Sequence, residues 1–198
     1  MEVKKQNKKI PLAFYRRKNV LQIGKELLGQ YLFTQFDGQL TGGKIIETEG
    51  YKGVEDKACH AYGNRKTSRT RTMFERGGVA YIYLCYGMHH LFNVVTCQMG
   101  VPHAVLIRAI IPTHGINIML KRRKKKTMIS SLTNGPGKVT QALGIHVLYN
   151  GISLISNQIW LEKSDADMAS HRILCSPRIG VEYAEEDALL PWRFHLTE

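Results

Sequence analysis

Residues 79–97 read VAYIYLCYGMHHLFNVVTC. Two runs rich in β-branched and aromatic residues, 79–86 and 91–97, flank a short stretch that contains a glycine. Such a pattern indicates two antiparallel strands joined by a tight turn. The segment therefore predicts a β-hairpin with its turn at residues 87–90 and with Tyr86 at its tip.

Strand-length apolar runs continue on both sides of this hairpin. We expect further strands over residues 31–36, 43–48, 104–110, 152–155, 159–161 and 173–175. We expect helices over residues 19–29, 115–123 and 137–143, the first of them capped by Asn19. Because strands dominate and hairpins are local, the chain predicts a mixed α/β (α+β) fold in one domain.

Glycine and proline mark the expected breaks between these elements. Residues 37–38 and 42–43 read as turns, and Pro112 reads as the end of a strand. Residues 52–71 are polar and read as a long functional loop.

The bulk composition is that of a globular protein. The chain has 198 residues, of which 43% are hydrophobic and 22% are charged. No apolar run is long enough to cross a membrane, and the charged N-terminus lacks the apolar core of a secretory signal. We expect a disordered basic arm over residues 1–10 and a single domain over residues 11–198. The scattered cysteines fit reduced thiols in the cytoplasm.

The charge is strongly basic. The 28 Lys and Arg residues against 16 Asp and Glu residues give a formal net charge of +12. This favours a polyanionic partner, either nucleic acid or an anionic membrane surface. Arg65, Arg69 and Arg71 stand among hydroxyl side chains and suit phosphate contacts, whereas residues 121–126 are a plain charge run.

Two carboxylates, Glu47 and Glu49, end an otherwise apolar strand segment. Because side chains alternate along a strand, both share one face if the strand continues that far. One use of a carboxylate there is as a base that activates water, and the other is a structural ion pair. Arg108 also interrupts an apolar strand, so it must find a polar partner. An ion pair with Glu47 or Glu49 is the structural explanation for its position.

Tyrosines are concentrated in the first strand of the hairpin. Tyr81 and Tyr83 share one side of that strand, and Tyr86 falls at the tip. Tyrosine is common in half-buried strands, yet an aromatic tip on a basic protein also suits a wedge pushed into a base stack. Asn93, in the second strand, must find a polar partner or line a site.

A metal site finds little support in the sequence. The possible ligands are Cys59, His60, Cys85, His89 and His90. They lack the close paired spacing that zinc ligands show. The glycine-rich residues 134–138 likewise lack the spacing of a phosphate-binding loop. We therefore expect no metal site and no phosphate-binding loop of this kind.

A set of short motifs, taken in order, resembles the alkyladenine (3-methyladenine) DNA glycosylase family. The motifs are Leu27-Leu28-Gly29, Glu47-Thr48-Glu49-Gly50-Tyr51 with Glu55-Asp56 and His60, Met73-Phe74, Tyr81-Ile82-Tyr83, Tyr86-Gly87-Met88, Asn93, Leu106-Ile107-Arg108-Ala109, Asn134-Gly135-Pro136-Gly137-Lys138, Pro177-Arg178-Ile179-Gly180-Val181 and Pro191-Trp192-Arg193-Phe194. The resemblance implies one compact domain around a curved antiparallel sheet flanked by helices, with a protruding β-hairpin and no cofactor.

The resemblance also implies catalytic roles. Glu49 would be the general base that activates water, while Arg108 and the backbone carbonyl of Ile179 would help to hold that water. The pocket segments carry no lysine, which favours direct hydrolysis over a Schiff base. The reaction would then remove an alkylated or deaminated purine and leave an abasic site.

Further roles concern the damaged base. Tyr51 and Tyr83 would sandwich the extruded base, and His60 would contact its edge. Asn93 would crowd the amino group of normal guanine.

The remaining implied roles concern the duplex. Tyr86, with Met88 beside it, would fill the gap that the base leaves, and the arginines of residues 65–71 would contact the backbone. His89 stands where an aromatic is common. The implied partner is double-stranded DNA with damaged purines, bound by a monomer at the nucleoid if the cell is bacterial.

Three other readings stay open. The first is a basic binding domain that uses the tyrosine hairpin as a stacking platform. The second is a different, zinc-dependent hydrolase built on Cys59, His60, Cys85 and His89. The third is a family member that has lost activity or handles one lesion only. The sequence does not rank 3-methyladenine, 7-methylguanine, hypoxanthine and ethenoadenine as substrates.

Overall fold

The computed structural model of the protein describes residues 8–165 and 172–197. Its strands are β1 (Tyr31–Phe36), β2 (Gln39–Tyr51), β3 (Ala80–Cys85), β4 (His89–Thr96), β5 (His103–His114), β6 (Ile159–Glu162), β7 (Arg172–Ser176) and β8 (Arg193–Thr197). Its α-helices are α1 (Leu12–Tyr15), α2 (Val20–Glu26), α3 (Ile116–Arg122) and α4 (Pro136–Leu143). Its short 3-10 helices are η1 (Gly53–Glu55), η2 (Tyr62–Asn64), η3 (Arg71–Phe74), η4 (Ser130–Leu132), η5 (Val147–Tyr149) and η6 (Glu182–Leu189).

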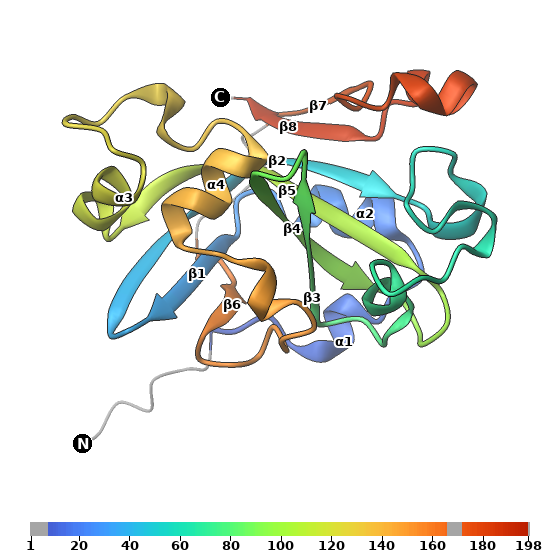
Figure 1. Ribbon diagram of the computed structural model, residues 1–198, viewed down its shortest axis with the longest axis horizontal. Coiled ribbons are helices and arrows are strands. Elements are labelled where there is room, and N and C mark those ends of the chain that lie inside the picture. The colour runs from blue at the N-terminus through green and yellow to red at the C-terminus, as the bar shows by residue number, and fades with distance from the viewer. Residues whose placement is uncertain (1–7, 166–171, 198) are drawn as a thin grey trace.

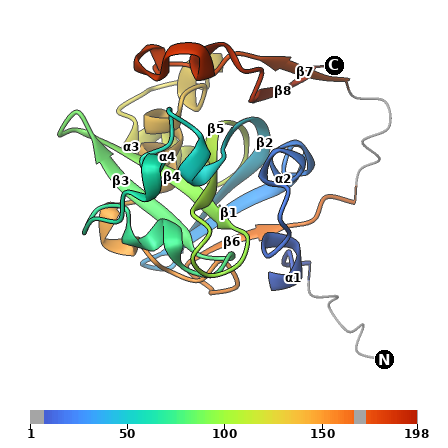
Figure 2. The ribbon, with the colours of Figure 1, turned by 90° about the vertical axis from the view of Figure 1, so that its right-hand side faces the viewer.

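Strand β2 is the centre of the sheet. The strand order is β3-β4-β5-β2-β1-β6, and all the pairs are antiparallel. The first part of β2 pairs with β1, whereas its residues 47–49 pair with β8, which in turn carries β7. Strands β7 and β8 therefore lie along the top of the molecule in Figures 1 and 2. The sheet is curled and antiparallel within one domain, which confirms the predicted α+β fold.

Strands β3 and β4 form the predicted hairpin, which projects from the body of the protein in Figure 2. Its turn falls at residues 86–88 and not at 87–90, because Cys85 already pairs with His89. Tyr86 has a φ of +49°, in the left-handed region that tight hairpin turns use. The second strand therefore begins earlier than predicted.

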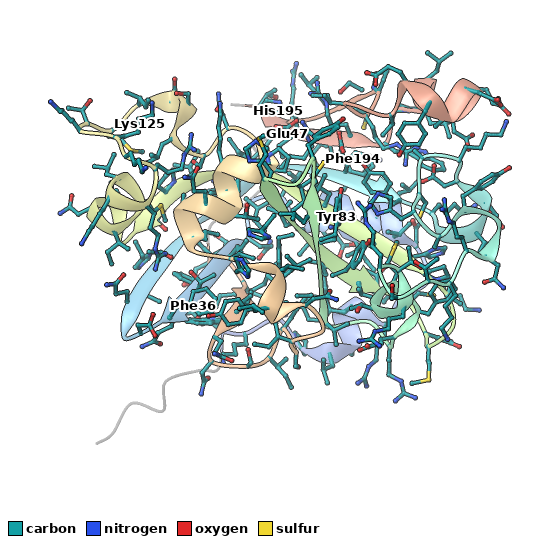
Figure 3. All side chains as sticks on the ribbon, in the orientation of Figure 1. Phe36, Glu47, Tyr83, Lys125, Phe194 and His195 are labelled. Atoms are coloured by element: carbon teal, nitrogen blue, oxygen red, sulfur yellow. The ribbon has the colours of Figure 1, made fainter. Side chains whose placement is uncertain are left out.

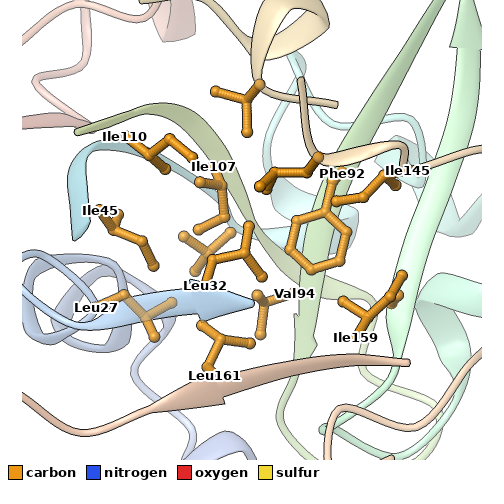
Figure 4. Close-up of a cluster of buried hydrophobic side chains, with 14 of the residues drawn as sticks. Leu27, Leu32, Ile45, Phe92, Val94, Ile107, Ile110, Ile145, Ile159 and Leu161 are labelled. Carbon is orange, nitrogen blue, oxygen red and sulfur yellow. The ribbon is translucent and has the colours of Figure 1, made fainter. Parts of the chain in front are cut away.

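The main hydrophobic core packs between the sheet and the helices (Figure 4). Leu32, Ile45 and Ile107 come from three neighbouring strands and are fully buried. Phe92 and Val94 extend this cluster onto β4. The core holds β2, β4 and β5 in fixed register, and these strands carry four residues of the predicted site, Glu49, Tyr51, Asn93 and Arg108.

The three predicted helices are present. The side-chain oxygen of Asn19 accepts a hydrogen bond of 3.0 Å from the backbone N–H of Gln22, so Asn19 caps α2 as predicted. Helices α3 and α4 lie where the sequence places them. Val139 and Leu143 bury one face of α4 in the core.

Gly42 and Gly43 lie inside β2, not in the predicted turn. A Cβ on Gly42 would lie 2.2 Å from the ring of Phe33, and one on Gly43 would lie 2.5 Å from the carbonyl oxygen of Ile111. The glycines therefore permit a close approach of neighbouring strands, and this tertiary demand overrides their turn propensity. The turn predicted at residues 37–38 is confirmed.

Strand β5 continues through Pro112 to His114, although the sequence predicts its end at the proline. Strand β4 pairs with β5 only as far as Leu106. Beyond that residue, one side of β5 has no strand beside it in the described part of the chain. A proline is tolerated on such an open side because no ladder partner needs its missing N–H.

Three further expectations need correction. Residues 152–155 form isolated bridges instead of a strand. Strand β8 was not predicted, because its short half-buried pattern depends on pairing with β2. Of the expected basic arm, residues 1–7 lie outside the described residues. The last residues of that arm belong to the domain, since Lys9 bridges to β6 and Ile10 is buried.

Candidate active site

A cavity of about 670 Å³ lies between the β3–β4 hairpin and the segment that follows Pro177. Its lining includes residues predicted for the site from separate parts of the chain: Tyr51, His60, Arg69, Tyr83, Tyr86, Asn93, Arg108 and Ile179. The volume lies within the range of small-molecule sites. The fold thus assembles one concave site from the predicted residues.

Glu49 lies directly behind the wall of this cavity and is fully buried. Its neighbours Thr48 and Gly50 face α2. The Thr48 hydroxyl donates a hydrogen bond of 2.9 Å to the carbonyl of Gly24, and a Cβ on Gly50 would lie 2.7 Å from Leu21. Because side chains alternate along β2, Glu49 points to the opposite face.

Three donors hold the Glu49 carboxylate. Oε1 lies 3.2 Å from Nη1 of Arg108 and accepts a hydrogen bond of 2.9 Å from the backbone N–H of Ile179. Oε2 accepts a hydrogen bond of 2.8 Å from the Tyr51 hydroxyl. Within the described residues this is the one hydrogen bond to Oε2, so a lone pair of that oxygen is available to a further donor.

Arg108 is the extra residue of a β-bulge in β5, because β2 has no residue opposite it between the pairs made by Ile107 and Ala109. A bulge redirects a side chain. The guanidinium contacts both carboxylates, with Nε 3.2 Å from Glu47 and Nη1 3.2 Å from Glu49. Arg108 also lines the cavity. The same guanidinium therefore forms the ion pairs with Glu47 and Glu49 and belongs to the candidate site.

Glu47 faces a different environment. It lies beside His195 of β8, as Figure 3 shows, and pairs with Arg193 at 3.2 Å in addition to Arg108. By contrast, Tyr51 and Ile179, which hold Glu49, both line the cavity. Glu49 is therefore the carboxylate connected to the cavity.

Burial raises the pKa of Glu49 above its ordinary value. The pKa is lowered in turn by the charge of Arg108 and by the hydrogen bonds from the Ile179 amide and the Tyr51 hydroxyl. The effect of burial is larger, so the pKa of Glu49 stays above its ordinary value. A buried carboxylate with a raised pKa and an available lone pair has the properties of a general base.

Aromatic rings form much of the cavity wall. Tyr83 from β3 (Figure 3) meets His60 edge to face, with ring centroids 4.6 Å apart. Nδ1 of His60 lies 2.9 Å from the Tyr81 hydroxyl. Burial and the charge of Arg69 lower the pKa of His60 to about 4, so its ring is neutral at pH 7. Tyr51 also lines the cavity.

Asn93 is buried on β4, opposite Tyr81 on β3. Its side-chain amide donates a hydrogen bond of 3.1 Å to the Tyr81 carbonyl. This contact supplies the polar partner that the sequence required and fixes the Asn93 side chain in the wall. Ile179 contacts Glu49 through its backbone amide, a contact that the sequence did not predict.

The tip of the hairpin is exposed. Tyr86 is 87% exposed and Met88 is 69% exposed. The left-handed backbone at Tyr86 is costly for an L-residue. Two large apolar side chains on a strained, exposed turn match the geometry of a wedge.

The basic residues divide into two groups. The Arg69 guanidinium lies 4.9 Å from the centre of the Tyr83 ring, at the cavity, whereas Arg65 and Arg71 are exposed away from its lining. From the run at residues 121–126, Arg123 lines the cavity. The sequence singled out neither this contact nor the buried Arg178, because both depend on long-range packing.

Lys138 also lines the cavity, although the sequence argument treats the pocket segments as free of lysine. Its Nζ donates a hydrogen bond of 2.9 Å to the side-chain oxygen of Asn134 at the start of α4. The absence of a pocket lysine therefore cannot be used to exclude a Schiff base.

Residues 8–165 and 172–197 contain no group of three or more His, Cys, Asp or Glu side chains that could hold a metal ion. All the cysteines that they contain, Cys59, Cys85, Cys97 and Cys175, are free thiols. The same residues include no helix of the length and apolarity that crossing a membrane requires.

The sequence is similar to known proteins along nearly its whole length. Residues 13–198 match the family described as methylpurine-DNA glycosylase. A Chlamydia abortus protein with the provisional name 3-methyladenine DNA glycosylase is 54% identical over 188 residues, which cover 94% of this chain and 97% of the relative. A Bacillus mycoides protein with the same provisional name is 46% identical over 193 residues, which cover 93% of this chain and 94% of the relative.

Proposed function

Because the chain belongs to the methylpurine-DNA glycosylase family, it is a DNA glycosylase, and we propose that Glu49 activates the water that hydrolyses the N-glycosidic bond. The substrate is double-stranded DNA that carries 3-methyladenine or another alkylated or deaminated purine. The observation that supports this role is the buried carboxylate of Glu49, whose partners line the cavity and whose Oε2 has an available lone pair.

The chemistry follows from the position of that carboxylate. As the bond between C1′ and the base breaks, positive charge develops on the sugar, and an adjacent carboxylate stabilises it. Glu49 takes a proton from water, and the water oxygen bonds to C1′. An alkylated purine that carries a positive charge departs with the electron pair of the broken bond. The product strand has an abasic site and is not cut.

The cavity holds the base outside the duplex. Base extrusion costs a few kcal/mol, and least for a damaged base that stacks poorly. The faces of Tyr51 and Tyr83 stack on the base, and neutral His60 contacts its edge. Asn93, fixed by its bond to the Tyr81 carbonyl, crowds the amino group of guanine and so disfavours that normal base.

The exposed surface completes the proposal. Tyr86 and Met88 fill the gap in the base stack, and Arg65 and Arg71 contact phosphates. The formal net charge of +12 provides affinity for any duplex, which supports association with the nucleoid and predicts binding that weakens with salt. We propose that a monomer suffices, because all of these residues belong to one chain.

Hydrolysis by water makes no covalent bond to the enzyme. Lys138, which lines the cavity, has the amine that a Schiff base with C1′ requires. Its Nζ donates a hydrogen bond to the side-chain oxygen of Asn134, and Lys138 is not among the residues that hold Glu49. We therefore propose that Lys138 contacts phosphate and takes no covalent part.

The direct test uses duplex oligonucleotides that each carry one lesion, with wild type and Glu49→Gln, and alkali to reveal abasic sites. Release of a damaged purine by wild type, lost in Glu49→Gln while DNA binding persists, supports the proposal and ranks the lesions. Binding that ignores damage, without release from any lesion, would favour a binding module. Unchanged release by Glu49→Gln would remove Glu49 as the base, and Glu47 would be tested next.

A further inference from the structure

Asp56 and Arg178 form an ion pair behind the cavity. Two hydrogen bonds join them, from Nη1 to Oδ2 at 2.6 Å and from Nη2 to Oδ1 at 2.8 Å. Both side chains are fully buried, and neither residue lines the cavity. A buried ion pair contributes little net stability, because the loss of hydration offsets the attraction of the charges. Its presence therefore calls for another explanation.

The guanidinium of Arg178 contacts the two residues that follow Glu49 in β2. Nη1 donates a hydrogen bond of 3.0 Å to the carbonyl of Gly50, and the guanidinium carbon lies 4.8 Å from the centre of the Tyr51 ring. Arg178 also precedes Ile179, whose amide donates to Glu49. One side chain thus fixes both neutral donors that hold the Glu49 carboxylate.

Asp56 ties the same group to the start of the long loop. Its carboxylate oxygens accept hydrogen bonds of 3.0 Å from the backbone N–H groups of Lys52 and Ala58. The turn that these bonds close leads directly to His60 in the cavity wall. The ion pair therefore joins β2, this loop and the C-terminal segment.

We propose that Asp56 and Arg178 are positioning residues for bond cleavage. They hold the Tyr51 hydroxyl and the Ile179 amide on Glu49, so that the carboxylate stays aligned with the water. This inference rests on the proposed function of Glu49. It implies that the loss of the pair slows the chemical step more than it weakens DNA binding, since neither residue contacts the cavity.

The test uses Asp56→Leu/Arg178→Met, in which two apolar side chains replace the pair and no buried charge remains alone. Melting temperature, affinity for lesion DNA and single-turnover release of the base are measured together. We expect a lower melting temperature, because the backbone groups of Lys52, Ala58 and Gly50 lose their partners. We expect the affinity to stay near that of wild type and the release rate to fall by about a hundredfold, the scale of a 1 Å misplacement. The control Arg17→Met/Glu26→Leu removes an exposed pair outside the site and should leave the affinity and the release rate unchanged.

Wild-type release from a folded double variant would overturn the inference. If the double variant does not fold, Arg178→Lys takes its place, because lysine keeps the charge against Asp56 but loses the planar contacts to Gly50 and Tyr51. A folded Arg178→Lys protein should release the base more slowly with affinity unchanged, and a wild-type rate would again overturn the inference. Failure of wild type itself to release any base would instead refute the proposed function.

Discussion

The backbone amide of Ile179 donates a hydrogen bond of 2.9 Å to Oε1 of Glu49, across 130 positions of sequence. The C-terminal segment therefore completes a site that begins on β2. Glu49 does not line the cavity, but its three partners, Tyr51, Arg108 and Ile179, all do. A substrate held in the cavity would thus meet the carboxylate through the space beside Tyr51 and Ile179.

The buried charge of Glu49 should reduce stability at high pH. Its pKa in the folded protein is raised, first by burial, so the unfolded chain ionises more readily. This loss of folding stability is absent well below the ordinary glutamate pKa of about 4.3, and it reaches its full size above the raised pKa of Glu49. The melting temperature of Glu49→Gln relative to wild type should therefore rise between pH 4 and pH 8.

Glu26→Gln is the matched control for this measurement. A hydrogen bond from Arg17 lowers the pKa of Glu26, so its ionised form stabilises the folded state. The relative melting temperature of Glu26→Gln should therefore fall as the pH rises to about 5 and should not change above that pH. If the relative melting temperature of Glu49→Gln does not change with pH, ionisation of Glu49 does not destabilise the folded protein.

Arg108→Gln should move the acid limb of the pH-rate profile upward. The charge of Arg108 lowers the pKa of Glu49, and its removal raises that pKa further. Because the general base acts when ionised, the rate then rises only at higher pH. Single-turnover rates from pH 4.5 to 9 measure this, with Arg193→Gln as the control, since Arg193 contacts Glu47 and not Glu49. An acid limb equal to that of wild type would contradict the coupling.

Tyr86→Asn should remove the wedge and keep the turn. Asparagine adopts the left-handed backbone of position 86 more readily than most residues. Stacking of an aromatic side chain on a base contributes about 1–3 kcal/mol, so the affinity for lesion DNA should fall by about fivefold to 150-fold. Binding titrations with lesion and undamaged duplexes check this, and the melting temperature should not change. Full affinity in the variant would exclude insertion of Tyr86.

Arg69→Gln should raise the pKa of His60. Burial lowers that pKa to about 4, and the charge of Arg69 contributes to the shift. Because burial persists in the variant, the His60 pKa should remain below the ordinary value of about 6.5. NMR titration of the His60 ring gives the value in both proteins. Lys138→Gln, which removes a charge elsewhere in the cavity lining, serves as the control, and an equal shift in both variants would argue against a specific effect.

Borohydride trapping distinguishes the role of Lys138. Hydrolysis by water leaves no Schiff base, so reduction during turnover should trap no covalent enzyme–DNA complex. Lys138→Ala should release the base at a rate near that of wild type and bind DNA with less salt dependence. A trapped complex that disappears in Lys138→Ala would replace the hydrolytic proposal with a covalent one.

Much of the site can be predicted because its chemistry lies in local motifs. Glu47 and Glu49 belong to one strand, and Tyr81 and Tyr83 to another, so alternation assigns a shared face to each pair. The places of Tyr51 and Tyr86 in the site follow from the family resemblance. Pairing across the sheet is harder to predict. No local signal marks Arg108 as a bulge residue, because the bulge exists only in the register between β2 and β5.

The other sequence predictions that the structure corrects also depend on pairing between distant residues. Gly42 and Gly43 have the propensity of a turn, yet close contact with Phe33 and Ile111 places them in a strand. The Asp56–Arg178 pair likewise joins positions 122 apart. In each case a partner distant in sequence decides the outcome, and a single sequence does not specify that partner.

The central claim, that Glu49 is the general base, is tested most directly by comparing Glu49→Gln with Glu47→Gln. Both residues pair with Arg108, and only Glu49 also contacts Tyr51 and Ile179. Single-turnover release is measured at saturating enzyme on a duplex whose lesion wild type removes. We expect Glu49→Gln to lose about 10²- to 10⁴-fold, the range of general-base catalysis, and Glu47→Gln to lose much less. Equal losses, or a larger loss in Glu47→Gln, would contradict the assignment.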